Sequence, residues 1–348
     1  MGKNPSLVSW KKSFAVRFAI VWALVLGASV GVSGWLSYRE SRQQLLGNLN
    51  EVVGQDSRVI KLRLETWLET LGNDTRSVSR SPVVREFLET RGTGEEQSWR
   101  GMVEDEFEAV FAGKPTYIQL RLLEVGGERE GREILRLDRK EDELVVTPPS
   151  ELQEKGGRDY FQEALECPVG EVCLSEINLN REFGKITEPR LPTIRSAIRI
   201  RAKRSREVML IINADLRLLF AELDELASPD TEIFLRDRKG DYLMHPEEGA
   251  RFATDLDRKT KSNPGAEESE ILSSTKISTG HWPGRELGLQ VALTDESWRT
   301  VLELTRARGL WTTILASLGG AALALGIAWF FSRRLRRLTR ALRQFDGR

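Results

Sequence analysis

The sequence predicts an α+β fold in which a long helix precedes two modules, each built on an antiparallel sheet, with a membrane helix at either side. Three observations lead to this prediction. The chain of 348 residues contains two uncharged apolar runs, at 18–38 and 309–331. A helical repeat of apolar residues follows the first run, and short stretches of alternating polarity occupy much of the region between 116 and 293.

Both apolar runs are long enough to cross a membrane. The hydrocarbon core of a bilayer requires about 20 helical residues, and Trp35, Trp311 and Trp329 lie near the ends of the runs, where indole rings prefer the headgroup region. We therefore predict transmembrane helices at 18–38 and 309–331. A cleaved signal peptide is the alternative for the first run. We disfavour it because the run is long and no small-x-small cleavage site follows.

Basic residues flank the outer ends of both runs. Residues 1–17 contain three lysines and one arginine with no acid, and residues 332–348 contain seven arginines and one aspartate. The positive-inside rule then predicts that both tails are cytoplasmic and that 39–308 lies on the outer side of the membrane. The totals of 52 basic and 52 acidic residues are equal, so this outer region is net negative. That charge argues against nucleic acid as a partner.

The few cysteines and histidines of the outer region limit the disulfides and metal sites that it can form. Cys167 and Cys173 are its only cysteines, and their close spacing in an oxidising compartment predicts a local disulfide, with two buried free thiols as the alternative. The only histidines, His245 and His281, are far apart and show no metal-ligand spacing. We expect no metal and no cofactor.

An apolar repeat with intervals mostly of three, four or seven follows the first span. Its members are Leu45, Leu49, Val52, Val53, Ile60, Leu64, Trp67 and Leu71. A helix of about 40 residues, roughly 60 Å long, is expected here. Its apolar seam either packs on its own domain or pairs with the same helix of a second chain, which would make the protein a homodimer. A second helical stretch is expected around 83–111.

Alternating polarity predicts strands in two groups. The first group comprises 116–123, 133–138, 195–200 and 207–213, for which we expect a five-stranded antiparallel sheet, and the second comprises 231–235, 241–245, 271–278 and 287–293. A helix is expected after Asp215, and another leads from Ser297 into the second span. The second sheet would therefore be joined directly to a membrane helix.

Five motifs follow one another in the first module. They are LQEK at 152–155, RDYF at 158–161, SEINLNREFG at 175–184, EPRLPTIR at 188–195 and IINAD at 211–215. In this order they resemble the double Cache family of extracellular sensor domains of bacterial receptors, over roughly residues 40–305. The resemblance implies a long N-terminal helix and two PAS-like modules, a membrane-distal one at 39–225, where ligand is usually held, and a membrane-proximal one at 226–308.

Eight polar residues are candidates for holding a small-molecule ligand. Tyr117, Gln119 and Arg121 share a predicted strand face, Arg136 and Asp138 share one on the next strand, and Arg158, Tyr160 and Arg195 match family-typical positions. Because guanidinium groups suit carboxylate or phosphate, an anionic ligand is expected. In the alternative, Arg121, Arg136 and Asp138 form internal ion pairs, and Ser175, Asn178 and Asn180 only cap turns. The amino-acid-binding signature of some double Cache receptors is not visible.

The last segment, 332–348, carries Leu335, Leu338, Leu342 and Phe345 at intervals of three and four. This pattern predicts a coiled-coil seam and resembles the first helix of a HAMP linker, although the usual proline is missing. A basic helix lying on anionic headgroups is the alternative.

The chain contains no HExxH, GxSxG, phosphate-loop or paired Cys-x-x-Cys motif, and we assign no catalytic residue. The predicted function is ligand sensing by a transmembrane receptor that passes binding to a cytoplasmic output by helix displacement. A histidine kinase output following residue 348 is expected. A chemotaxis receptor, a diguanylate cyclase front end, an accessory membrane protein without output and a structural envelope protein are the alternatives.

Overall fold

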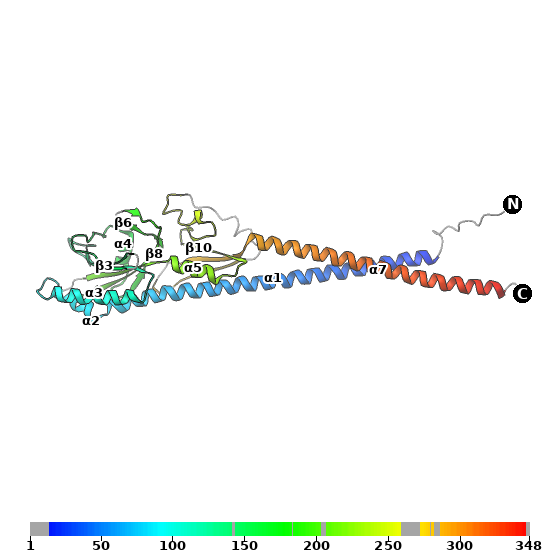
Figure 1. The fold of residues 1–348 in the computed structure, drawn as a ribbon, viewed down its shortest axis with the longest axis horizontal. Helices are drawn as coiled ribbons and strands as arrows, with labels where there is room; N and C mark the ends of the chain where they lie inside the picture. The colour runs from blue at the N-terminus through cyan, green and yellow to red at the C-terminus, as the bar shows by residue number, and fades with distance from the viewer. Residues whose placement is uncertain are drawn as a thin grey trace. The chain divides into compact units, whose positions relative to one another are not determined.

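A computed structural model describes residues 14–140, 143–182, 184–202, 207–258, 272–278, 280–281 and 286–345 (Figure 1). The chain divides into two compact units. One comprises Met1–Leu49 with Asp295–Arg348, and the other comprises Asn50–Thr294. Each unit is described by itself below.

Helices α1 (Phe14–Ser79) and α7 (Asp295–Phe345) contain the two apolar runs. Both are long and apolar enough to cross a membrane. The structure therefore joins the first run and the predicted long helix into one element, and α7 continues to Phe345. The tail at 1–13 and the side chains of the predicted coiled-coil seam lie outside the described residues.

Within the first unit, α1 and α7 approach each other closely at glycines. A Cβ atom added to Gly34 would lie 3.0 Å from the Thr313 Oγ1, and one added to Gly309 would lie 2.5 Å from the Tyr38 ring. Small residues at helix contacts are typical of membrane helix pairs, because backbones can approach only where no side chain intervenes.

The first sheet of the second unit has seven strands instead of the five expected. They are β1 (Tyr117–Val125), β2 (Glu133–Lys140), β3 (Glu143–Val146), β4 (Val172–Leu174), β5 (Asn178–Leu179), β8 (Pro192–Arg201) and β9 (Glu207–Asp215). The order is β3-β2-β1-β9-β8-β4, with β5 paired to β8. Strands β3, β4 and β5 are too short to show alternation in the sequence. Strands β6 (Arg181–Glu182) and β7 (Lys185–Ile186) form a separate ribbon.

Helices cover both faces of this sheet. They are α2 (Pro82–Thr90), α3 (Glu96–Ala112) and α4 (Asp159–Glu166). Figure 1 shows α2 and α3 on the same side as α1, and α4 on the opposite side. The Thr75 hydroxyl of α1 donates to the Ser196 hydroxyl of β8 at 2.7 Å, and Ile60, Leu64 and Leu68 of α1 are fully buried. The part of the apolar seam that contains Val53, Ile60, Leu64 and Leu71 therefore packs on its own domain, whereas Val52 is exposed.

The second sheet contains the four strands expected from the sequence. They are β10 (Thr231–Arg236), β11 (Tyr242–Met244), β12 (Leu272–Ile277) and β13 (Leu287–Leu293), in the order β11-β10-β13-β12. Helix α5 (Arg217–Leu226) follows β9, as expected, and leads into this sheet. A short 3-10 turn, η3 (Glu248–Ala250), follows β11. Phe234, Tyr242 and Ala292 form a small apolar cluster.

Candidate functional site

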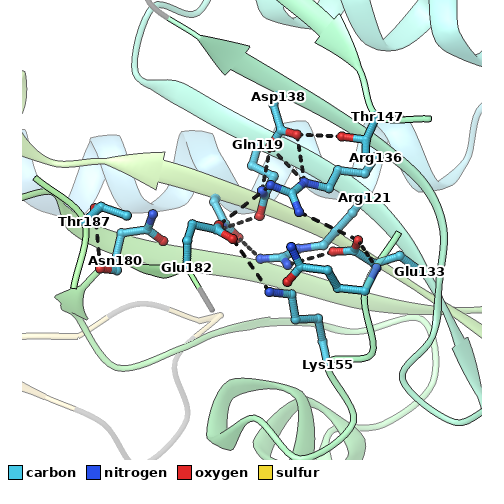
Figure 2. A network of polar contacts seen from close by, with 12 residues as sticks. Gln119, Arg121, Glu133, Arg136, Asp138, Thr147, Lys155, Asn180, Glu182 and Thr187 are labelled. Carbon is cyan, nitrogen blue, oxygen red and sulfur yellow. Dashed lines mark hydrogen bonds and ion pairs between the residues drawn. The ribbon is translucent and has the colours of Figure 1, made fainter. Parts of the chain in front are cut away.

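A buried polar network occupies the face of the first sheet that looks toward α4 (Figure 2). Register places its members on one face, because Arg121 pairs with Arg136, Gln119 with Asp138, and Asn213 with both Gln119 and Arg195. All six of these side chains are at most 9% exposed. Five of them are residues predicted from the sequence, and Asn213 is an addition.

Most of this network is paired internally. The Arg121 Nη1 lies 3.2 Å from the Glu133 Oε1, and the Arg136 Nε lies 2.8 Å from the Asp138 Oδ2. The Gln119 amide donates to the Asp138 Oδ1 at 2.6 Å. These are the internal ion pairs that the sequence left open as an alternative. They fix the shape of the sheet face, because buried charges are tolerated only when paired and hydrogen-bonded.

Tyr117 lies on the opposite face of the sheet, contrary to the sequence prediction. A β-bulge between Tyr117 and Gln119 shifts the register, so Tyr117 pairs with Ala214 and not with Asp215, which regular pairing from Gln119 and Asn213 would give. Its hydroxyl donates to the Asp74 Oδ2 of α1 at 2.6 Å. A bulge adds one residue to a strand and reverses which face the following side chains occupy. Burial and Asp74 raise the pKa of the Tyr117 hydroxyl.

A second bulge brings an unpredicted acid into the network. The register shift between Leu122 and Leu123 pairs Leu123 with Glu133, which places Glu133 on the same face as Arg136. Strict alternation from Arg136 would have turned Glu133 away. The Glu133 side chain is fully buried and accepts from Arg121 and from the Gln153 backbone N–H.

Lys155 enters the network through a close backbone crossing. Its N–H donates to the Gly131 carbonyl at 2.8 Å, and its ammonium lies 3.9 Å from the Glu182 Oε2. Burial, with the positive charge of Arg121 added, lowers the pKa of Lys155 to about 8. Lys155 belongs to the LQEK motif but was not predicted as a site residue. The chemistry of that motif becomes apparent only once β2 is beside it.

Arg195 is the least compensated cation of the face. It is 5% exposed, and its Nη1 donates to the Asn178 Oδ1 at 2.8 Å, while its Nε finds no partner among the described residues. The Tyr160 ring of α4 lies against both guanidinium groups, 4.8 Å from Arg195 and 5.5 Å from Arg121. Burial lowers the pKa of Arg195 to about 10, and the charges of Arg121 and Arg158 add to the effect, while Tyr160 and Asp255 partly oppose it. The group remains protonated at neutral pH.

A cavity of about 230 Å³ opens beside Arg195. Its walls include Tyr160, Ser175, Ala197 and His281, and the disulfide formed by Cys167 and Cys173 also lines it. Of the eight predicted site residues, Tyr160 and Arg195 line the cavity. Gln119, Arg121, Arg136 and Asp138 lie in the paired network behind it, and Tyr117 lies across the sheet. Arg158 is half-buried at the N-cap of α4 and is not among the residues that line the cavity.

The sequence matches a family model described as "Bacterial histidine kinase, sensor domain" over residues 69–271, which is more than half of the chain. The chain belongs to this family. The match covers the entire first sheet, α5 and the first hairpin of the second sheet. A search of the curated proteins found no match.

Solved structures of sensor domains share the fold. A domain of a sensory box/GGDEF family protein from Vibrio parahaemolyticus has 19% identity and a TM-score of 0.53, covering 74% of this chain and 98% of that one. The extracellular domain of a histidine kinase named vpHK1S-Z8 has 19% identity and a TM-score of 0.58, covering 74% and 95%. A methyl-accepting chemotaxis protein X has 9% identity and a TM-score of 0.52, covering 72% and 100%.

These similarities confirm the predicted fold class and the resemblance to Cache-type sensor domains. The chain is therefore a sensor domain of the bacterial histidine kinase type, and two of its helices are long and apolar enough to span a bilayer.

Proposed function

We propose that the cavity beside Arg195 binds a small anion and that this binding is the signal the receptor senses. The observation that carries the proposal is a buried guanidinium that lies at a cavity wall and has no carboxylate within ion-pair distance in the described part of the chain. Burying an uncompensated charge is costly. A ligand carboxylate would supply the missing negative charge and accept from the unpaired Nε.

The surroundings of Arg195 restrict the ligand further. Arg158 is half-buried, close enough to influence the Arg195 charge, and without a side-chain partner in the described residues. Arg121 contributes a third positive charge behind Tyr160. The volume of about 230 Å³ lies below the usual range of about 300 to 1,000 Å³. It corresponds to on the order of eight water molecules. A short carboxylic or hydroxycarboxylic acid fits these limits.

An amino acid is the second candidate. Glu166 lines the same cavity and offers a carboxylate for an ammonium group. The two candidates differ in whether a ligand requires a positive group, so matched acids with and without an amino group distinguish them.

A thermal-shift screen of the full chain in detergent micelles tests the proposal. Short carboxylic acids are compared with their uncharged amides and with the corresponding amino acids. A ligand at 100 times its Kd stabilises the fold by about 2.7 kcal/mol, which corresponds to a rise in Tm of roughly 5 to 10 °C for a domain of this size. Stabilisation by an acid but not by its amide supports an anion site. Equal shifts with acids and amides would contradict it.

We further propose that both termini are cytoplasmic, as the basic flanks indicate. Cysteine labelling in intact cells provides the test, since the native cysteines are joined in a disulfide. An impermeant maleimide is expected to label Ser98→Cys on the exposed surface of α3 and to leave Ser6→Cys unlabelled. Labelling of Ser6→Cys in intact cells would show that the N-terminus lies outside the membrane and would contradict the proposal.

Signalling to a histidine kinase output, by displacement of α7 within a homodimer, is the mechanism we propose. Support comes from the sequence of elements, because α7 begins directly after β13 and continues through the apolar run to Phe345. Val52 and Val59, one heptad apart on α1, are 38% and 41% exposed and are candidates for the contact with a second chain. Disulfide crosslinking of Val59→Cys between copies tests this contact.

A further inference from the structure

A second cavity lies where the two sheets of the Asn50–Thr294 unit meet. Its volume is about 320 Å³. The first module contributes Leu179 and Pro192, α5 contributes Phe220, and the second module contributes Leu243 and Phe252. Four of these side chains are at most 6% exposed. The fifth, Pro192, is also buried. The cavity therefore has an apolar floor.

Arginines stand at the wall of this cavity, and they differ in how they are paired. The Arg217 guanidinium lies 2.8 Å from the Asp215 Oδ2, and the Arg190 Nε lies 3.6 Å from the Glu188 Oε1. Arg251 has no carboxylate within 4 Å among the described residues. Its Nε donates to the His245 carbonyl at 2.8 Å, and within the described part of the chain its two terminal nitrogens remain available as donors.

Two acids also line the cavity but do not neutralise Arg251. Neither Asp224 nor Glu248 is within ion-pair distance of it in the described structure. Burial raises the pKa of Asp224, and Arg251 only partly opposes this effect. An anion entering the cavity would therefore find its strongest unpaired donor in Arg251.

The loop that presents Arg251 and Phe252 is held rigidly. Phe252 has a φ of 53°, which is unusual for a bulky side chain. Its N–H donates to the Tyr242 carbonyl at 2.7 Å, and the Asp241 carboxylate accepts from the N–H groups of Ala253 and Thr254 at 3.1 and 3.0 Å. These contacts maintain the cavity wall before any ligand arrives, which lowers the entropic cost of binding.

We propose that this cavity is a second ligand site, separate from the one beside Arg195, and that it binds an amphiphilic carboxylate. The apolar floor takes an alkyl chain and Arg251 takes the carboxylate. A volume of this size holds roughly ten non-hydrogen atoms at about 30 Å³ each. Because its walls come from both modules and α5, an occupant would tie the two sheets together.

The test uses the full chain in lipid nanodiscs, titrated calorimetrically with sodium octanoate after subtraction of heats from empty nanodiscs. Saturable binding of one octanoate per chain is expected. Octan-1-ol, which has the chain but no charge, and acetate, which has the charge but no chain, are expected to show no saturable binding at this site. Binding of octan-1-ol as tight as that of octanoate would overturn the assignment of an anion site.

Two variants locate the site. Arg251→Gln is expected to weaken octanoate binding by about tenfold or more, because it removes a charge-assisted hydrogen bond. Arg258→Gln is the matched control, since Arg258 belongs to the same loop, is exposed and does not line the cavity. Ala221→Trp fills the cavity from an exposed position of α5 and is expected to abolish octanoate binding. It therefore tests the site even if Arg251→Gln does not fold. Unchanged affinity in Ala221→Trp would overturn the proposal.

Discussion

Arg195 has a buried guanidinium that no carboxylate pairs with in the described structure, and the proposed anion site accounts for it. Among the described residues, the only hydrogen-bond acceptor of the guanidinium is the neutral Asn178 side chain, and the Tyr160 ring offers a weaker attraction. Polar residues that bind a ligand often lack hydrogen-bond or charge partners when the ligand is absent. Replacing such residues therefore stabilises the fold at the expense of function.

We therefore expect Arg195→Met to raise the free energy of unfolding of the ligand-free protein by about 1 to 3 kcal/mol. Urea unfolding followed by circular dichroism measures this change. Arg201→Met at the exposed end of the same strand is the control and should change stability by less than about 0.5 kcal/mol. Destabilisation by Arg195→Met would show that the guanidinium is already compensated.

Lys155 gives the fold a pH dependence of its own. Its pKa is lowered to about 8 in the folded state from an ordinary 10.5, so between these values the unfolded chain binds more protons than the folded one. The contribution of Lys155 to the free energy of unfolding therefore rises as the pH increases from about 8 to 10.5. The free energy of unfolding of the wild type should rise relative to that of Lys155→Met across this interval. A constant difference between the two would contradict the assigned pKa.

Individual residues of the site could be predicted where a motif or strict alternation applied. Arg195 and Tyr160 were found from motifs, and Arg121 and Arg136 from alternation. Tyr117 was predicted on the wrong face of the sheet, and Glu133 was not predicted at all. The reason is the same for both, because a β-bulge lies beside each residue. A bulge depends on the partner strand, and a single sequence contains no signal for it.

Among the elements, the turn between β1 and β2 controls how Lys155 reaches the network. Gly131 has a φ of 79°, and a Cβ atom there would overlap the Gly156 backbone. Gly127, in the same turn, has a similar φ of 77° but open space around it. A comparison of substitutions at Gly127 and Gly131 therefore separates the cost of a positive φ from the cost of crowding against the Gly156 backbone.

Gly127→Ala should cost about 1 kcal/mol, the usual penalty for a side chain at positive φ. Gly131→Ala should cost distinctly more, because the segment bearing Lys155 must also move. Urea unfolding of both variants measures the difference. Equal losses would mean that the crossing of Gly131 and Gly156 has no structural importance.

Long elements were predictable and short ones were not. The apolar periodicity of α1 and the alternation of β1, β8 and β9 extend over many residues, whereas β3, β4 and β5 have only two to four residues each. These short strands form because β2 and β8 supply unpaired edges beside them. Their existence depends on tertiary contacts.

At the scale of the whole sensor domain, one segment links the cavity to the second module. Asn178 accepts from Arg195, while two residues earlier Glu176 pairs with Arg238 and Lys239 of the second module, each at 2.8 Å. A ligand that draws Arg195 away from Asn178 would therefore disturb contacts between the modules. Such a continuous series of contacts is a physical route for coupling.

Glu176→Ala should change ligand affinity by less than about threefold and should remove the ligand-induced change in hydrogen exchange at amides 237–241. Glu286→Ala, which breaks an exposed ion pair with Lys276 inside the second module, is the control. If exchange at 237–241 still responds to ligand in Glu176→Ala, the coupling follows another route.

Whether a small anion binds at Arg195 is measured by calorimetric titration of the full chain with the most stabilising short carboxylic acid. We expect one site per chain in the wild type, unchanged affinity in Arg201→Gln, and at least about a tenfold loss in Arg195→Gln. Equal affinity in Arg195→Gln and in the wild type would contradict the proposed anion site.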